Sequence, residues 1–588
     1  MKKFLLPKPI YVQENNGSFL FENPALVAEN CDCRVIKAID KLYETYGRRG
    51  AESTGTFTVC HGTGTDEAYS LSVTEGGIAI HADSPAGAFY AVQTLKQLLK
   101  QGRELPCLEI HDKPEFEHRG FYHDVTRGRM PTVQTLKGFI DTLAEYKINS
   151  LQLYMEHSFA FEEYKDFNAN QEPYTEADII ELDEYCKENF IDLIPSLSCF
   201  GHLYELLQLE EYQHLCELEN FVPNDHFWRE RMFHHTIDAT NPESVVLIKS
   251  MIDRYVKCFS SKYFNICCDE TFDLGKGRNS GKPLADLYIG FVSQIIRHLE
   301  EKGKTVMLWA DVVHNHLDEI DKISKDAILL NWEYGSDVDL SKFKKLADLG
   351  RTQISCPCVW GHKRLIEYLP ESIANIRKVA AFSKICNAKG ILNTYWGDFG
   401  HFCSPLNVGY STILGAVESW CPVMCEDEYF DAAISALHYS NPDGQVVSAM
   451  KSVSRADEVV ILSHCFLALG YPGFEQEGLK TEKLTAENMD AWIAAHQNAA
   501  KVFENALSSN AVAPDLAKSL LLAANGYVVL LQGLNRLVNG KKYDNWEKEF
   551  TVWTALFCED WLRQNRKDEL YHIVEFFNTF KDAVLKKA

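Results

Sequence analysis

Two adjacent carboxylates, Asp269 and Glu270, directly follow residues 262–268, a short apolar stretch that is typical of a β-strand. Acids at the end of an apolar strand are costly to hold there, which indicates a function. Successive strand residues point to opposite faces, so we expect that the two groups do not oppose each other at the roughly 5–9.5 Å of a two-carboxylate hydrolytic site. One would instead protonate a leaving oxygen while its neighbour orients the substrate. The alternative is a strand end with two solvated acids.

From residue 118 onward, short apolar strands alternate with helical patterns, which predicts parallel β/α units. Eight strands are predicted, at residues 119–124, 149–155, 191–197, 263–268, 305–310, 327–332, 352–356 and 390–396. Helix starts lie between several of them. Thr175 with Asp178 resembles a capping box, and Asn241 before Pro242 supplies an N-cap and a first-turn proline. Eight such units imply a (β/α)8 TIM barrel whose active site lies at the C-terminal ends of the strands.

Polar and aromatic side chains cluster where these predicted strands end. They are Asp124, Glu156, His157, His202, Asp269, Glu270, Trp309, Asp311, Trp332, Tyr334, Trp360, His362, Trp396 and Asp398. Indole rings around a pocket would stack on the apolar faces of a sugar ring. Packing inside the barrel is the alternative for any single tryptophan, but four at one end favour a carbohydrate site.

The chain is too long for one core, and its periodicity divides it into three parts of an α/β protein. Residues 1–115 are predicted to form an N-terminal α+β domain, with a hairpin over residues 68–81 and a helix that starts at Ser84-Pro85. Residues 116–425 would form the catalytic barrel. Residues 426–588 show helical periodicity throughout and predict a C-terminal helical domain.

Composition excludes several classes of function. A net charge of −24 argues against a nucleic-acid partner. We expect no membrane span, and Pro7 interrupts the apolar start before a signal peptide could form, which predicts a cytoplasmic protein. The 18 cysteines are scattered and lack the spacing of a zinc site. Free thiols, no metal and no cofactor are therefore expected.

Several motifs, in order along the chain, resemble glycoside hydrolase family 20, the β-N-acetylhexosaminidases. They are residues 118–127 on the first strand, residues 194–202, which end in Gly-His, residues 265–270 with the Asp-Glu pair, and residues 392–398 with a Trp-x-acid motif. Residues 67–95 resemble the small α+β domain that precedes the barrel in this family. The resemblance covers roughly residues 50–420.

The resemblance implies retaining hydrolysis assisted by the substrate, without an enzyme nucleophile. The 2-acetamido oxygen would attack the anomeric carbon and form an oxazolinium intermediate. Asp269 would accept a hydrogen bond from the acetamido N–H and stabilise the positive charge. Glu270 would protonate the leaving oxygen and later activate water.

Further roles are carried over from the family to single residues. Arg119 and Asp398 would hold sugar hydroxyls, the alternative for Arg119 being an ion pair with a barrel acid. His202 would orient the catalytic pair or be a core histidine. Tryptophans would line the acetamido pocket and the sugar floor, namely Trp309, Trp332 and Trp396, with Trp360 as a further candidate.

The chain departs from the family pattern at three places. Glu156 and His157 replace an Asp-Asp-Gln-Gly-Trp-Arg stretch, which predicts a different loop after the second strand. The tyrosine that contacts the acetamido group is not readily placed, with Tyr334 and Tyr395 as candidates. Asp398 stands where glutamate is commoner, so the preference between GlcNAc and GalNAc stays open.

The expected partner is an oligosaccharide or glycoconjugate fragment with a terminal β-linked HexNAc. The first hypothesis is an exo-acting β-N-acetylhexosaminidase. The alternatives are a lacto-N-biosidase, an enzyme for sulfated HexNAc, or a non-catalytic glycan-binding barrel, which the retained acid pair disfavours. Helical extensions often form dimers, so a homodimer is a further expectation.

Overall fold

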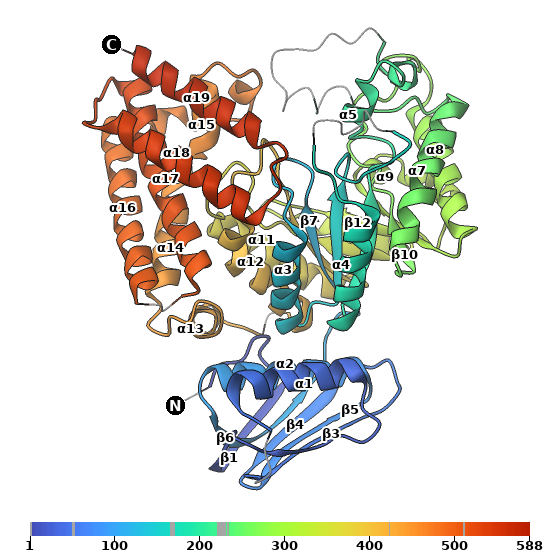
Figure 1. Cartoon of the computed structure of the whole chain (residues 1–588). Helices are drawn as coiled ribbons and strands as arrows, with labels where there is room; N and C mark the ends of the chain where they lie inside the picture. Colours follow the sequence, from blue (N-terminus) through green and yellow to red (C-terminus); the bar gives the residue numbers. More distant parts are fainter. Residues whose placement is uncertain are drawn as a thin grey trace.

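The computed structural model describes residues 3–49, 53–164, 171–219, 231, 235–422, 424–509 and 512–587. It forms an N-terminal sheet domain, a closed parallel barrel and a C-terminal helical region (Figure 1). This is the fold class that the sequence predicted. All 18 cysteines lie in the described part of the chain, and all are free thiols, as expected.

The N-terminal domain is a six-stranded mixed sheet with the order β1-β6-β4-β5-β3-β2. Its elements are β1 (Tyr11–Leu20), β2 (Ala25–Val27), α1 (Cys33–Tyr46), β3 (Thr56–His61), β4 (Tyr69–Thr74), β5 (Gly77–Ala82), α2 (Pro85–Lys100) and β6 (Glu104–Asp112). The predicted hairpin is β4–β5, and Ser84 caps α2 by accepting a hydrogen bond from the N–H of Gly87. Both helices cover the sheet face that looks toward the barrel (Figure 1).

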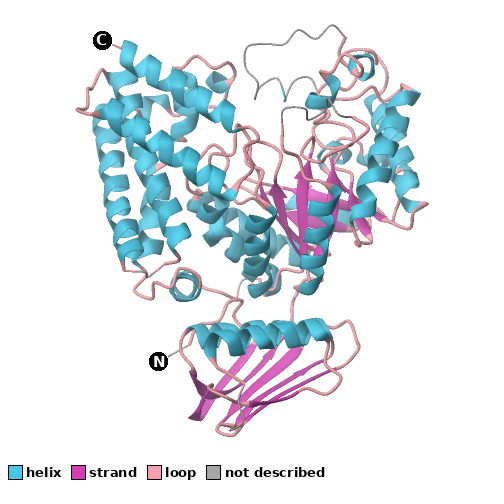
Figure 2. Ribbon diagram, in the orientation of Figure 1, coloured by secondary structure: helices cyan, strands magenta, loops and turns pink. Residues whose placement is uncertain are grey.

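Eight parallel strands close the barrel in the order β10-β11-β12-β13-β14-β7-β8-β9. Figure 2 shows the barrel strands in magenta with helices around them. The strands are β7 (His118–Asp124), β8 (Ser150–Met155), β9 (Asp192–Leu197), β10 (Tyr263–Asn265), β11 (Thr305–Trp309), β12 (Ile328–Trp332), β13 (Gln353–Cys356) and β14 (Gly390–Tyr395). All eight lie where the sequence predicted them.

One predicted strand is too long, because β10 ends at Asn265 and not at Cys268. Cys267 and Cys268 have φ values of 56° and 63°, which no strand accommodates. The Asn265 side chain accepts a hydrogen bond from the N–H of Cys267 and holds this turn. The chain therefore leaves the strand before it reaches the two acids.

Helices surround the barrel as expected for β/α units. They are α3 (Val133–Glu145), α4 (Glu176–Glu188), α5 (Tyr204–Leu207), α7 (Pro242–Tyr255), α8 (Leu284–Glu300), α9 (Asp311–His314), α10 (Leu340–Asp348), α11 (Leu369–Ile385) and α12 (Gly409–Trp420), with short 3-10 helices at Gln213–Leu215, Val256–Cys258, Leu317–Lys322 and Pro405–Val408. Thr175 and Asp178 form the predicted capping box of α4, and Asn241 caps α7.

The C-terminal region packs beside the barrel (Figure 1, orange to red). Its helices are α13 (Asp427–Leu437), α14 (Gln445–Ala456), α15 (Ile461–Ala468), α16 (Ala486–Ser508), α17 (Pro514–Asn539), α18 (Trp546–Gln564) and α19 (Leu570–Lys586), with short 3-10 helices at Phe474–Gln476 and Thr481–Lys483. By length and composition α17 is the one described helix that could cross a membrane, but 78% of its most apolar window is buried inside the molecule. This burial is typical of a core helix.

Candidate active site

Asp269 and Glu270 converge on one imidazole at the C-terminal end of the barrel. The Nε2 atom of His202 lies 3.6 Å from Oδ2 of Asp269 and 3.4 Å from Oε2 of Glu270. The expectation that the two carboxylates point to opposite faces was wrong, because the strand ends before them and Glu270 has a φ of 45°. The two acids act on one small region of space.

His202 is held in place by the loop that follows β9. The backbone N–H of His202 donates to Nδ1 of His235 over 2.8 Å, and the two imidazole rings stack with their centroids 4.7 Å apart. Gly201 must be glycine here, because a Cβ would lie 2.7 Å from the carbonyl oxygen of Asp269. The Gly-His motif therefore allows the histidine loop to approach the acid pair.

The charges at this point depend on one another. Burial alone would lower the pKa of His202, but Asp269 and Glu270 offset this effect and raise it to about 10. His202 is thus an imidazolium at neutral pH that neutralises part of the negative charge. Oδ1 of Asp269 is buried and has no hydrogen-bond partner among the described residues, which leaves an acceptor for a substrate N–H.

Asp311, at the start of α9, supports the pair from below. Its Oδ2 accepts the N–H of Glu270 over 2.9 Å and so holds the left-handed backbone of that residue. Burial, together with the charge of Asp269, raises the pKa of Asp311 to about 7. The sequence indicated Asp311 only as an acid at a strand end, and its position two residues after Trp309, the last residue of β11, was the available signal.

An aromatic wall stands beside the acids, made of Trp332, Tyr334, Trp360 and Trp396. Trp332 and Tyr334 stack with ring centroids 4.8 Å apart. The Tyr334 hydroxyl accepts from the Trp396 indole over 2.9 Å, and the Trp360 indole donates to the Tyr334 carbonyl over 2.7 Å. These four predicted residues are therefore brought together.

Trp309 lies beneath this wall. It is fully buried, with its ring centroid 5.8 Å from that of Trp396 and 5.1 Å from that of Tyr122. It supports the wall and has no exposed surface to stack on a sugar.

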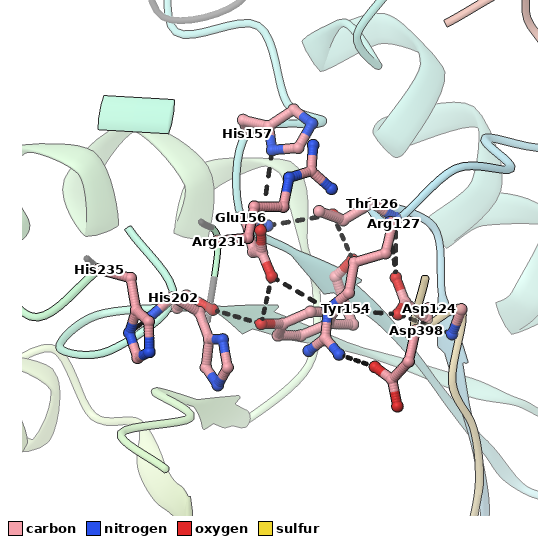
Figure 3. Close-up of polar contacts among 12 residues, drawn as sticks. Asp124, Thr126, Arg127, Tyr154, Glu156, His157, His202, Arg231, His235 and Asp398 are labelled. Atoms are coloured by element: carbon pink, nitrogen blue, oxygen red, sulfur yellow. Dashed lines mark hydrogen bonds and ion pairs between the residues drawn. The ribbon is translucent and has the colours of Figure 1, made fainter. Parts of the chain in front are cut away.

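Arg127 gathers the remaining acids of this end (Figure 3). Its Nε lies 3.2 Å from Glu156 and 3.6 Å from Asp124, and its Nη1 donates to Asp398. Burial opposes ionisation of Glu156 and Asp398, but Arg127 more than offsets it and holds both pKa values below their ordinary range. Nη2 of Arg127 makes no hydrogen bond to the described residues, so it is open to a ligand. The sequence indicated Arg127 only as the last residue of the first-strand motif, residues 118–127.

Arg119 does not reach this site, which corrects the prediction for it. Position 119 is at the start of β7, and the substrate end of a barrel is where its strands finish. The side chain is completely buried and bonds to Glu67, to the Tyr90 hydroxyl and to the carbonyls of Phe116 and Lys147. The alternative of an ion pair fits, although the partner comes from the N-terminal domain.

Tyr395 also points away from the site. It is fully buried, its hydroxyl donates to the carbonyl of Cys403 in the loop after β14, and its ring packs against His123 and His401. Of the two tyrosine candidates, only Tyr334 faces the aromatic wall. His157 lies close to the site but is completely buried behind Glu156.

The donor atoms of His202, Asp269 and Glu270 lie within 4.8 Å of one another, a spacing that a metal ion could also bridge. The expectation of no metal and no cofactor stays a prediction. The stacked His235 and the hydrogen bond from Glu270 to Asp311 give the group an organisation suited to acid–base work.

Comparisons with known proteins relate two parts of the chain to one family. Residues 2–113 match the profile of glycosyl hydrolase family 20, domain 2, and residues 116–362 match its catalytic domain. A lacto-N-biosidase of Bifidobacterium bifidum is 26% identical over 286 residues, which cover 46% of this chain and 24% of the relative. A β-hexosaminidase of Porphyromonas gingivalis is 25% identical over 381 residues, which cover 56% of this chain and 47% of the relative. The chain thus spans less than half the length of these two relatives.

Solved structures share the fold. A chitobiase of Flavobacterium johnsoniae has a TM-score of 0.61 at 17% identity, with 99% of both chains covered. An exo β-N-acetylglucosaminidase of Vibrio harveyi, solved with N-acetylglucosamine, has a TM-score of 0.59 at 19% identity, with 73% of this chain and 76% of that chain covered. The two profile matches together span more than half of the sequence. The chain therefore belongs to glycoside hydrolase family 20.

Proposed function

We propose that this protein is an exo-acting retaining β-N-acetylhexosaminidase that releases terminal β-linked GlcNAc or GalNAc. The observation that carries the proposal is the convergence of Asp269 and Glu270 on His202 beside an aromatic wall. The open Oδ1 of Asp269 suits an acetamido N–H, which ordinary sugars lack.

The substrate would supply its own nucleophile. The acetamido carbonyl oxygen forms a bond to the anomeric carbon as the bond to the leaving oxygen breaks, and Glu270 gives its proton to that oxygen. Asp269 accepts the acetamido N–H and stabilises the positive charge of the oxazolinium. Glu270 then takes a proton from water as the water oxygen opens the oxazolinium with retention.

Binding of the sugar would fall to Arg127 and the aromatic wall. Arg127 and Asp398 offer a donor and an acceptor to ring hydroxyls in charge-assisted hydrogen bonds. Trp332 and Trp396 offer the faces on which the ring stacks, and the Tyr334 hydroxyl is the candidate for the acetamido oxygen. The charge of His202 offsets the electrostatic repulsion between Asp269 and Glu270.

A second candidate is a lacto-N-biosidase, because a relative with that activity is 26% identical to this chain. Such an enzyme removes a disaccharide and needs room beyond one sugar. An enzyme for sulfated HexNAc would need a free cation near the sugar. Of three candidates on loops, Lys363 pairs with Glu477 and Arg278 with Glu219, whereas Lys276 makes no ion pair with the described residues. The acid pair still disfavours a non-catalytic barrel.

The decisive experiment is hydrolysis of p-nitrophenyl β-GlcNAc and β-GalNAc by the wild type and by Asp269→Ala, with the thiazoline analogue of the oxazolinium as inhibitor. Cleavage that the thiazoline inhibits and the variant loses supports substrate assistance. Cleavage only of p-nitrophenyl lacto-N-bioside would favour the second candidate. Cleavage that the thiazoline does not inhibit contradicts the proposed mechanism.

A cytoplasmic location, glycoconjugate fragments as substrates and a homodimer are also part of the proposal. Fractionation of the source cells tests the first. Sedimentation velocity of the purified protein tests the last, since a monomer at micromolar concentration would contradict it.

A further inference from the structure

The connection between α18 and α19 reaches the substrate end of the barrel, although it belongs to the C-terminal helical region. Backbone contacts fix it to the loop after β7: the N–H of Arg566 donates to the carbonyl of Met130 over 2.8 Å, and the N–H of Thr132 donates to that of Gln564 over 3.0 Å. This loop also carries Arg127. Glu569 is the last residue of the connection before α19 and is buried, with 1% of its surface exposed.

Glu569 belongs to a buried ion cluster behind the sugar-facing residues, in which Glu205 also pairs with Arg231 at 3.3 Å. The Glu569 carboxylate accepts from both terminal nitrogens of Arg231, and its Oε1 lies 3.5 Å from Nε2 of His157. Burial would raise the pKa of Glu569, but Arg231 and His157 more than offset this and hold it at about 2. The carboxylate is therefore ionised at every pH at which the enzyme would work.

Glu156 connects this cluster to the site, with one oxygen on each side. Its Oε1 accepts from the Tyr154 hydroxyl over 2.8 Å and from Nε of Arg127 over 3.2 Å. Its Oε2 faces Nδ1 of His157 at 3.9 Å, an ion-pair distance (Figure 3). The orientation of one carboxylate thus depends on a guanidinium in the site and on an imidazole held by the C-terminal region.

Arg127 needs such a constraint, because three carboxylates compete for it. Asp124 is fixed by the N–H groups of Thr126, Arg127 and Gly397, whereas Asp398 has 33% of its side chain exposed. Asp124 and Glu156 are both buried, and Glu156 is the one whose second oxygen faces a residue held by the C-terminal region, so its position can change the angle of the guanidinium plane. A change at Glu569 would alter that angle through His157.

We propose that the C-terminal helical region completes the substrate site through Glu569, a positioning residue that holds His157 and Arg231 against Glu156 and thereby orients Arg127 toward the sugar. The inference rests on the proposed function for the identity of that sugar. It assigns a role to a part of the chain that lies outside the matched family profiles.

The test compares Glu569→Gln with a matched control, Arg566→Met. Arg566 lies on the same connection and joins it to the barrel through Asp178 and two backbone carbonyls, without contact to the site. With p-nitrophenyl β-GlcNAc, we expect Glu569→Gln to raise KM by about 10-fold, to weaken inhibition by GlcNAc equally and to leave kcat within about 3-fold. The control should lose thermal stability and keep its KM.

A double-mutant cycle with Glu156→Gln shows whether the effect passes through Glu156. In that background Glu569→Gln should change KM by less than about 2-fold. Equal KM values for Glu569→Gln and the control would overturn the inference while the proposed function stands. If Glu569→Gln does not fold, His157→Gln breaks the same path from the barrel and must give the same KM change.

A crystal structure of Glu569→Gln gives an answer that does not depend on activity. The inference expects Arg127 to lose its contact with Glu156 or Asp398, and an unmoved guanidinium would overturn it. A wild type inactive on every substrate named above would contradict the proposed function, and the crystal structure would then decide the inference alone.

Discussion

The two ends of strand β7 each bury an arginine, and the two arginines have different surroundings. Arg119 lies at the N-terminal end of β7, here called the opening end, with its guanidinium 4.9 Å from the Trp420 ring and 5.4 Å from the Tyr90 ring. Arg127 follows the C-terminal end of β7, here called the closing end, and its guanidinium lies 4.9 Å from the Tyr154 ring and 5.1 Å from the Trp396 ring. Both are paired with acids and stacked on aromatic rings.

The difference is in how completely the protein satisfies each group. Arg119 has no exposed surface. Its charge is paired with one carboxylate, and its N–H groups also donate to three further acceptors of the protein, so no donor is left for a ligand. Arg127 keeps 11% of its side chain exposed and shares three carboxylates, with one nitrogen open. A fully buried arginine with all its partners in the protein joins domains, whereas a partly exposed one with surplus acids can bind a ligand.

Removal of the candidate acid at the closing end should have the largest effect. Glu270→Gln cannot donate a proton, so kcat/KM on p-nitrophenyl β-GlcNAc should fall by about 10³. A 2,4-dinitrophenyl leaving group needs less help and should lose far less. Glu67→Gln at the opening end is the matched control and should keep full activity. Equal losses on both leaving groups would contradict the role of Glu270.

The two arginines themselves give the next largest contrast. Arg127→Met should lower kcat/KM by about 100-fold, because charge-assisted bonds to the sugar are lost in substrate and transition state alike. Arg119→Met should leave the kinetics of the folded enzyme unchanged and lower its stability by about 3 kcal/mol, because buried acceptors lose their donor. Urea unfolding and initial rates measure both. A kinetic defect in Arg119→Met would remove the distinction between the two ends.

Much of this contrast could be read from the sequence, and the reasons for the errors are physical. Apolar stretches with turn signals located all eight strands. Strand direction would have separated the two arginines, since position 119 opens β7 and position 127 follows it. The early end of β10 had no such signal, because cysteines occupy left-handed positions where glycine is usual.

The parts of the site that come from distant segments were beyond sequence reasoning. The acid pair, His202 and the aromatic wall each follow a predicted strand, so the barrel rule brings them together. Glu569 belongs to a helical segment about 300 residues from Asp269 and shows no local pattern. Only the packing of α18 and α19 on the barrel places it there.

Buried acids at the two ends should differ in their response to pH. Asp311 has a pKa of about 7, raised by burial and by Asp269, whereas Asp112 pairs with Lys147 at 3.0 Å. Unfolded chains release this proton near pH 4, so between pH 4 and 7 the native state binds more protons, and wild-type stability falls as pH rises. As pH rises from 4 to 8, the free energy of unfolding of Asp311→Asn should therefore increase relative to that of the wild type by on the order of a few kcal/mol.

Urea unfolding at pH 5 and pH 8 measures this difference. Asp112→Asn is the control, since it breaks a buried pair and should be destabilised at both values. Parallel pH dependence for Asp311→Asn and wild type would mean that Asp311 is ionised throughout, and the acid below Glu270 would then resemble its counterpart at the opening end.

The smallest expected effect concerns which hydroxyl the closing end recognises. Asp398 meets Arg127 at the exposed edge of the cluster, so one added methylene moves its carboxylate outward without filling a buried space. The C4 hydroxyl is the group that distinguishes GlcNAc from GalNAc, and a shifted acceptor changes its hydrogen bond in one epimer more than in the other. Asp398→Glu should change the ratio of kcat/KM on the two p-nitrophenyl substrates by about 3- to 10-fold.

Glu67→Asp, the matched change at the opening end, should leave that ratio unchanged, because Glu67 pairs with the buried Arg119 and does not reach the substrate. An unchanged ratio in both variants would assign recognition of the epimer to the aromatic wall, and the surplus acid at the closing end would then serve only to hold Arg127.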